Sequence, residues 1–198
     1  MGFSQLRLFP ITERGNTGLP VYGTPVSLQT DKKSAEVNSV EISIEFVSKE
    51  KVLAADDTEE VREVIVRFGG TLKVYDVLAS ALDSVLGYEI DKNGNVVETV
   101  NSGNKKHFGL YFRCKNSRDV KFQKYIYDVE FLKPNETHAT DSGDGTATID
   151  LKFNGRIITA DGKKYPAFNV YEGKLGYLEE GIEPTLMKFP VFNQSTNS

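Results

Sequence analysis

The chain has 198 residues, of which 39% are apolar and 26% are charged, a composition typical of a folded globular protein. It carries 24 Lys and Arg against 28 Asp and Glu, and the resulting net charge of −4 excludes strong non-specific binding of DNA or anionic membranes through overall charge. The single cysteine, Cys114, excludes an intrachain disulfide.

Both ends of the sequence are expected to form extended arms around a domain spanning residues 31–181. Residues 1–30 contain three prolines and four glycines, and residues 182–198 contain two prolines and end in a polar run. The C-terminal arm nevertheless contains five apolar residues, Leu186, Met187, Phe189, Val191 and Phe192. These side chains either pack on their own domain or contact a neighbouring subunit.

Five stretches alternate apolar and polar residues, as half-buried β-strands do. They are residues 40–47, 63–68, 108–114, 125–131 and 147–153. In the second stretch, Val64 and Val66 are expected to face inward with Phe68. Turn pairs such as Asn93-Gly94 and Asn154-Gly155 separate the stretches. The pattern predicts an antiparallel β-sandwich or barrel.

Residues 73–86 have a helical period instead. Apolar residues recur from Val74 through Leu78 and Leu82 to Leu86, and Gly87 follows as a stop signal. This amphipathic helix is expected to cover an open face or end of the sheet. The predicted fold class is therefore β-rich α+β, with one flanking helix.

The connection between the first two strands, residues 48–61, is expected to be a long loop. A hairpin needs only two to five loop residues, and longer loops are usually functional. We therefore expect this loop to contact something outside its own domain. The residues proposed for that contact are Lys49, Val52, Leu53, Asp56, Asp57, Glu59 and Glu60.

The sequence offers few candidates for catalysis, and we expect no enzyme, cofactor or metal site. His107 and His138 lack partners at metal-ligand spacing, and both are expected to lie on the solvated surface. Cys114 shares a strand face with Phe108, Leu110 and Phe112, so a buried structural thiol is expected.

An ordered set of short features suggests a family. The set is Leu53–Asp57 in the long loop, Gly69-Gly70-Thr71-Leu72, the helical segment with Gly87, Asp91–Val96, His107–Arg113, Tyr125–Asp128, Thr146–Leu151 and Asp161–Lys163. Taken in order over about residues 5–175, these features resemble the major tail protein family of long, flexible-tailed bacteriophages, which form the tail tube.

This resemblance implies a β-sandwich or half-barrel whose copies form rings of six subunits that stack into a conduit for the genome. It implies that the long loop and the terminal arms bridge successive rings. The implied partners are further copies of the chain, the tape measure, tail tip and tail terminator proteins, and DNA that passes without specific binding. The implied location is the virion tail, with the host cytoplasm during assembly and no membrane.

Within such a tube, the polar sides of the first two strands are candidates for the lumen wall. The candidate residues are Glu41, Ser43, Glu45, Glu63 and Arg67. The alternative is that this face simply meets bulk solvent.

Two other classes of function compete with the tube subunit. One is a β-sandwich binding module that uses some of the 9 tyrosines and 12 phenylalanines to recognise a surface glycan or protein. The absence of tryptophan, a common platform for sugars, favours the tube. The other is a hydrolase that depends on His107 or His138.

Overall fold

The computed structural model describes residues 3–15, 18–26, 39–55, 58–75, 85–87, 89–93, 95–97, 106–132 and 148–191. The described strands are β1 (Phe3–Arg14), β2 (Pro20–Tyr22), β3 (Ser39–Ala55), β4 (Thr58–Tyr75), β5 (Glu89–Ile90), β6 (Val96–Val97), β7 (His107–Lys115), β8 (Lys121–Phe131), β9 (Thr148–Gly155), β10 (Ile158–Ala160), β11 (Lys163–Tyr165) and β12 (Ala167–Tyr171). The expected antiparallel β architecture is confirmed, and helical structure is a minor part of the described residues.

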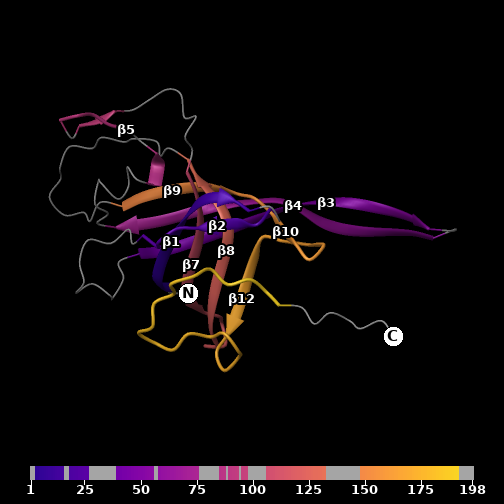
Figure 1. The fold of residues 1–198 in the computed structure, drawn as a ribbon. Helices are drawn as coiled ribbons and strands as arrows, with labels where there is room; N and C mark the ends of the chain where they lie inside the picture. Colours follow the sequence, from indigo (N-terminus) through magenta and orange to yellow (C-terminus); the bar gives the residue numbers. More distant parts are fainter. Residues whose placement is uncertain are drawn as a thin grey trace.

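One large sheet organises the molecule (Figure 1). Its strand order is β2-β1-β7-β8-β9-β4-β3, and β12 also pairs with β8. β5 pairs with β6, and β10 with β11, as small separate hairpins. Although β1 and β3 are near opposite ends of the order, they contact each other. The sheet therefore curls into an open half-barrel.

The inner face of this curl holds the main core. Phe108, Leu110 and Phe112 of β7 are buried there, as their alternation predicts. They pack against side chains that the other strands of the sheet place on the same face, including Leu8, Leu72, Ile126 and Leu151. Ile42 and Ile44 of β3 pack against this cluster and remain partly exposed. Strands at both ends of the order thus contribute to one core, because the sheet curls.

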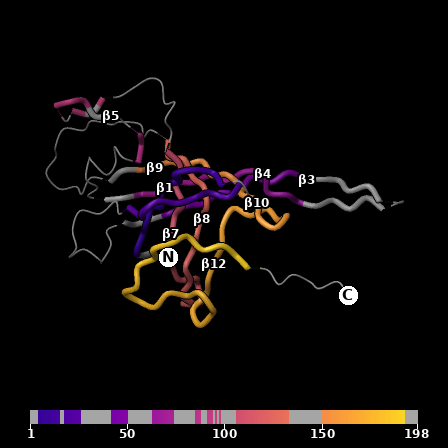
Figure 2. Tube along the Cα trace, in the orientation of Figure 1, coloured from indigo at the N-terminus to yellow at the C-terminus, as the bar shows by residue number. Residues whose placement is uncertain are grey.

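A second core covers the outer face of the sheet. Tyr111, Tyr125 and Tyr127 are fully buried there. Residues 172–191, which we call the C-terminal strap, cross this face, and Figure 2 shows them in orange and yellow beside β8 and β12. Met187 is 7% exposed, and the Phe189 ring stacks on Tyr127 at a centroid distance of 4.9 Å.

The strap settles part of the expectation for the C-terminal arm. Met187 and Phe189 pack on their own domain, because the tyrosines of β7 and β8 give them an apolar surface. Leu186 is 72% exposed and Val191 is 93% exposed, so both remain available for a contact with another chain. Phe192 lies outside the described residues.

The first part of the expected N-terminal arm is a strand of the main sheet. β1 lies between β2 and β7. Its consecutive residues Leu8 and Phe9 point to opposite faces of the sheet, and both are 0% exposed. A strand covered on both faces shows no apolar–polar alternation, which is why the sequence pattern did not reveal it.

The expected helix is wrong at its start and confirmed at its end. Residues 73–75 belong to β4 and pair with Asp150, Ile149 and Thr148 of β9. These three residues are therefore strand, although the sequence has a helical period there. Residues 76–84 lie outside the description. Val85 and Leu86 are helical, Val85 enters the main core, and Gly87 follows in the left-handed conformation with φ 77°.

Gly70 allows β3, β4 and β9 to approach closely, and Gly70→Ala tests this packing. A methyl group there would overlap the Ser43 carbonyl oxygen and lie 2.7 Å from the Phe153 ring. We expect the free energy of unfolding to fall by about 1–3 kcal/mol, as overpacking usually costs, measured by urea denaturation.

Gly162→Ala is the control, since Gly162 has φ 71° and open space where a Cβ would stand. It should cost only the left-handed backbone penalty of about 1 kcal/mol. Equal losses in the two variants would contradict the packing role of Gly70.

Candidate functional site

The most prominent surface feature is a free two-stranded ribbon. β4 pairs with β9 only from Phe68 to Tyr75, while its residues 58–67 pair with β3 alone. We call residues 47–55 of β3 and 58–67 of β4 the distal ribbon. It extends well beyond the other strands (Figure 1).

The expected long loop is therefore mostly strand. β3 continues to Ala55 and β4 begins at Thr58, with Val52 opposite Val61 and Leu53 opposite Glu60. The expectation was wrong because the acidic residues of this segment interrupt the apolar–polar alternation that identifies a strand. Cross-strand pairing between β3 and β4, which the sequence pattern does not reveal, orders the segment. Of the seven contact candidates, Lys49 is exposed, Val52, Leu53, Glu59 and Glu60 are in the ribbon, and Asp56 and Asp57 lie outside the described residues.

Apolar side chains are exposed on both sides of the ribbon and at its base. Their relative exposures are 46% for Phe46, 39% for Val47, 42% for Val64, 41% for Ile65 and 43% for Val66. The expectation that Val64 and Val66 face the core is wrong, because β9 ends opposite Phe68 and supplies nothing to cover them. The ribbon thus has apolar surface that its own domain leaves uncovered.

A β-bulge at the base of the ribbon changes which residues share a face. Val47 pairs with Arg67, but Ser48 pairs with Ile65, so Val66 is the extra residue. Cross-strand partners project from the same side of a sheet. Arg67 therefore shares a face with Glu45, whereas Glu63, opposite Glu50, lies on the other.

The bulge divides the lumen candidates. Ser43, Glu45 and Arg67 are exposed on one face, and Glu63 is exposed on the other, where its carboxylate accepts a hydrogen bond from Ser48 Oγ. Glu41 pairs with Lys73 in the backbone register, and its side chain is outside the description. The lumen role of these residues stays a prediction.

The register extends the polar face onto β9, which the sequence analysis missed. Thr71 lies between Ser43 and Lys152, and Lys73 pairs with Asp150. The Lys73 ammonium and the Asp150 carboxylate are 4.0 Å apart. The face thus carries charges of both signs. Its residues from β9 could be identified only by knowing that β9 is the neighbour of β4.

A buried carboxylate lies where β8 changes its pairing partner. β8 pairs with β12 up to Ile126 and with β9 from Val129 onward. At this branch point the β7–β8 register shifts, leaving Tyr127 and Asp128 opposite Gly109. The Asp128 main-chain oxygen accepts a hydrogen bond from the Arg156 N–H at 2.8 Å.

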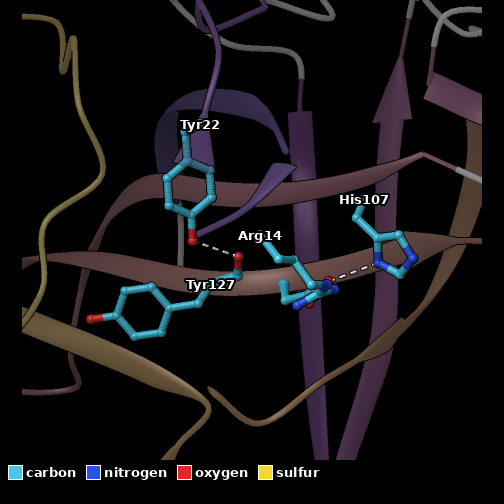
Figure 3. A network of polar contacts seen from close by, with 5 residues as sticks. Arg14, Tyr22, His107 and Tyr127 are labelled. Atoms are coloured by element: carbon cyan, nitrogen blue, oxygen red, sulfur yellow. Dashed lines mark hydrogen bonds and ion pairs between the residues drawn. The ribbon is translucent and has the colours of Figure 1, made fainter. Parts of the chain in front are cut away.

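The Asp128 side chain connects three strands, and Figure 3 shows its partners Arg14 and His107. It is 0% exposed, and its oxygens lie 2.5 Å from Arg14 Nη2 and 2.7 Å from His107 Nδ1. Beside it, the Tyr22 hydroxyl donates to the Tyr127 carbonyl at 2.7 Å. Burial, reinforced by the Asp128 charge, raises the pKa of Tyr22 far above its usual value, so it remains a donor. The network ties the ends of β1 and β2 to the branch point.

The expectation that His107 is a solvated surface residue is wrong. It is the first residue of β7, its side chain is 17% exposed, and Asp128 holds its ring. The signal in the sequence was Ile126, an apolar residue on the supposed polar face of β8, which indicates a shift of phase before Asp128. His138 lies outside the described residues.

Cys114 is half-buried against the main core. Burial raises the pKa of its thiol to about 11, against a smaller opposing effect of Lys124. The reactive thiolate is therefore rare at neutral pH, consistent with a structural thiol.

Neither a metal site nor a membrane-spanning helix is found in the part of the chain that the structure describes. Within it, no three His, Cys, Asp or Glu side chains are grouped so that they could hold a metal ion. None of its helical segments is long and apolar enough to cross a bilayer.

Comparison with solved structures finds a likeness, whereas the sequence comparisons find none. No family model matches the chain, and no curated protein matches it. A chain in the cryo-EM structure of the anti-feeding prophage baseplate, 6-fold symmetrised, aligns with a TM-score of 0.42 and 8% identity, covering 85% of this chain and 91% of that one. A TM-score of this size does not show a shared fold.

Asp128→Ala tests the network at the branch point. The substitution leaves Arg14 and His107 without their buried partner, and we expect the free energy of unfolding to fall by about 3 kcal/mol in urea denaturation. Lys115→Ala, which removes the exposed Lys115–Asp119 ion pair, should leave stability near that of the unmodified protein. A similarly small loss for Asp128→Ala would contradict a structural role for the network.

Proposed function

We propose that this chain is the major subunit of a phage tail tube, whose rings of six copies stack into a conduit for the genome. The observation that carries the proposal is the distal ribbon with its uncovered apolar side chains. The ordered sequence features that resemble the tail-tube family support the same assignment. In this proposal the chain is structural and has no catalytic role.

The ribbon needs a partner to hold it. A two-stranded hairpin is only marginally stable alone in water, and contiguous exposed apolar surface usually marks an interaction site. Phe46, Val47, Val64, Ile65 and Val66 would be covered if the ribbon lay against another copy. Contact with the next ring explains why the ribbon extends beyond its own sheet.

The open edge of the sheet supports lateral assembly. β3 is the last strand in the order, and its described residues pair with β4 alone. A long unpaired edge is a liability in a monomer, and pairing between subunits removes it. β2 ends the sheet on the other side, so a contact between the two different edges would be heterologous and could close a ring.

The polar face of β3, β4 and β9 suits a lumen wall. The Lys73–Asp150 pair and the mixture of Glu45, Arg67 and Lys152 provide no block of positive charge. Tight phosphate binding requires several uncompensated cations, so DNA could pass this surface without being held.

The other partners in this proposal are the tape measure, tail tip and tail terminator proteins, which the family resemblance implies. The chain would act in the virion tail, after assembly in the host cytoplasm.

Ile65→Glu tests the ribbon as an assembly surface. A charge on this exposed side chain should leave the fold intact and prevent burial against a second copy. We expect the unmodified protein to form rings or tubes in negative-stain electron microscopy, with a tail-tip seed if needed. In sedimentation velocity, the concentration needed for assembly of Ile65→Glu should be at least about tenfold higher, which corresponds to a loss of about 1.4 kcal/mol in contact energy.

Val120→Glu is the matched control, because Val120 is 40% exposed in the turn between β7 and β8, away from the ribbon. It should assemble normally. Assembly of Ile65→Glu at the normal level would remove the ribbon from the interface. A seeded protein that remained monomeric at every concentration would contradict the tube, and saturable glycan binding by that monomer would support a binding module.

A further inference from the structure

We propose that a small anion, inorganic or a carboxylate, binds beneath the C-terminal strap, where Arg113, Tyr111 and Tyr125 present hydrogen-bond donors without acceptors outside this group. This proposal is independent of assembly. It concerns the outer face of the sheet, beginning two to three residues along β7 and β8 from the bulge that holds Asp128.

The site is a block of side chains on two paired strands. Tyr111 of β7 lies opposite Tyr125 of β8, with ring centroids 5.1 Å apart, and Arg113 lies opposite Gln123. The strap closes over this block. Gln123 donates to the Leu178 carbonyl at 2.6 Å and accepts from the Leu178 N–H at 3.1 Å.

Arg113 is a buried cation without a counter-ion in the described part of the chain. It is 9% exposed, and its Nη2 donates to the main-chain oxygens of Glu179 at 2.6 Å and Ile182 at 3.0 Å. Its guanidinium lies 5.8 Å from the centre of the Tyr177 ring. None of the ion pairs among the described residues includes it. A buried charge is costly unless an opposite charge compensates it.

Three donors of this block lack an acceptor outside it. The hydroxyls of Tyr111 and Tyr125 and the Nε of Arg113 are buried and have no hydrogen-bond partner outside this block, within which Arg113 interacts with the Tyr111 hydroxyl. Both tyrosine rings are 0% exposed. Burial raises the pKa of each phenol, against the opposing charge of Arg113, so both remain protonated at neutral pH. Buried polar groups left unpaired cost about 1–3 kcal/mol each, so this set requires an explanation.

An anion fits this set better than water. It accepts from all three donors and also compensates the Arg113 charge, whereas a water molecule leaves that charge unpaired and brings two protons that need acceptors. Arg7, opposite Tyr111 in β1, adds positive potential, and its own ion pair is with Glu183 of the strap. Because Arg113 also holds the strap, a bound anion would fasten residues 172–191 to the sheet.

The test is urea denaturation of the full chain in sodium chloride, sulfate or acetate, each replacing a bulky sulfonate salt at constant ionic strength. We expect at least one of these anions to stabilise the fold saturably, and at ten times its dissociation constant the unfolding equilibrium constant should fall about tenfold. The three anions distinguish a halide, a tetrahedral oxyanion and a carboxylate.

The double variant Tyr111→Phe/Tyr125→Phe should lose this anion response while keeping the packed rings. Tyr22→Phe is the matched control, since its hydroxyl has a partner in Tyr127 at a different site. It should lose stability and retain the response. The proposal is overturned if no anion stabilises the protein beyond the sulfonate reference, or if the double variant responds as the unmodified protein does.

Discussion

The structure depends on how one sheet covers its two faces and its two edges with a single chain. The inner face is closed by curling, so that strands from both ends of the order share one core. The outer face is closed by the C-terminal strap, which packs on the tyrosines of β7 and β8. With both faces covered, the edge of β3 still has no second strand to pair with, and the distal ribbon still exposes apolar side chains. The proposed assembly would cover this edge and this ribbon.

The bulge at Asp128 allows one face of the sheet to be covered by curling and the other by the C-terminal strap. The shift opposite Gly109 lets β8 change from β12 to β9, which divides the sheet into a curled part and a part covered by the strap. A buried carboxylate at this point would be costly alone, and Arg14 compensates its charge while His107 hydrogen-bonds to it. Gly109 has a second role, since a Cβ there would lie 2.7 Å from the Tyr22 ring and 2.8 Å from Met187. β2 and the strap therefore meet over one glycine.

The sequence predicted the parts of the fold that depend on local periodicity. The alternation of Phe108, Leu110 and Phe112 identified a strand and its buried face, and Gly87 ended a helical segment as expected. The assignment of residues to the faces of the sheet was wrong where an extra residue in a strand shifts the apolar–polar alternation. The extra residue at Val66 places Glu63 on the face opposite Arg67, and the shift at Asp128 places Tyr127 and Val129 on opposite faces of β8. Which strands are neighbours is a non-local property, so the polar face of β9 and the partner of His107 were beyond a reading of periodicity.

The edge of β3 offers the most direct test of assembly. Hydrogen–deuterium exchange followed by mass spectrometry would compare residues 42–50 in dispersed and assembled protein. We expect rapid exchange of the edge-facing amides in the dispersed chain and strong protection after assembly, because the edge gains a strand from a second copy. Assembly that leaves exchange in β3 and the ribbon unchanged would contradict the account.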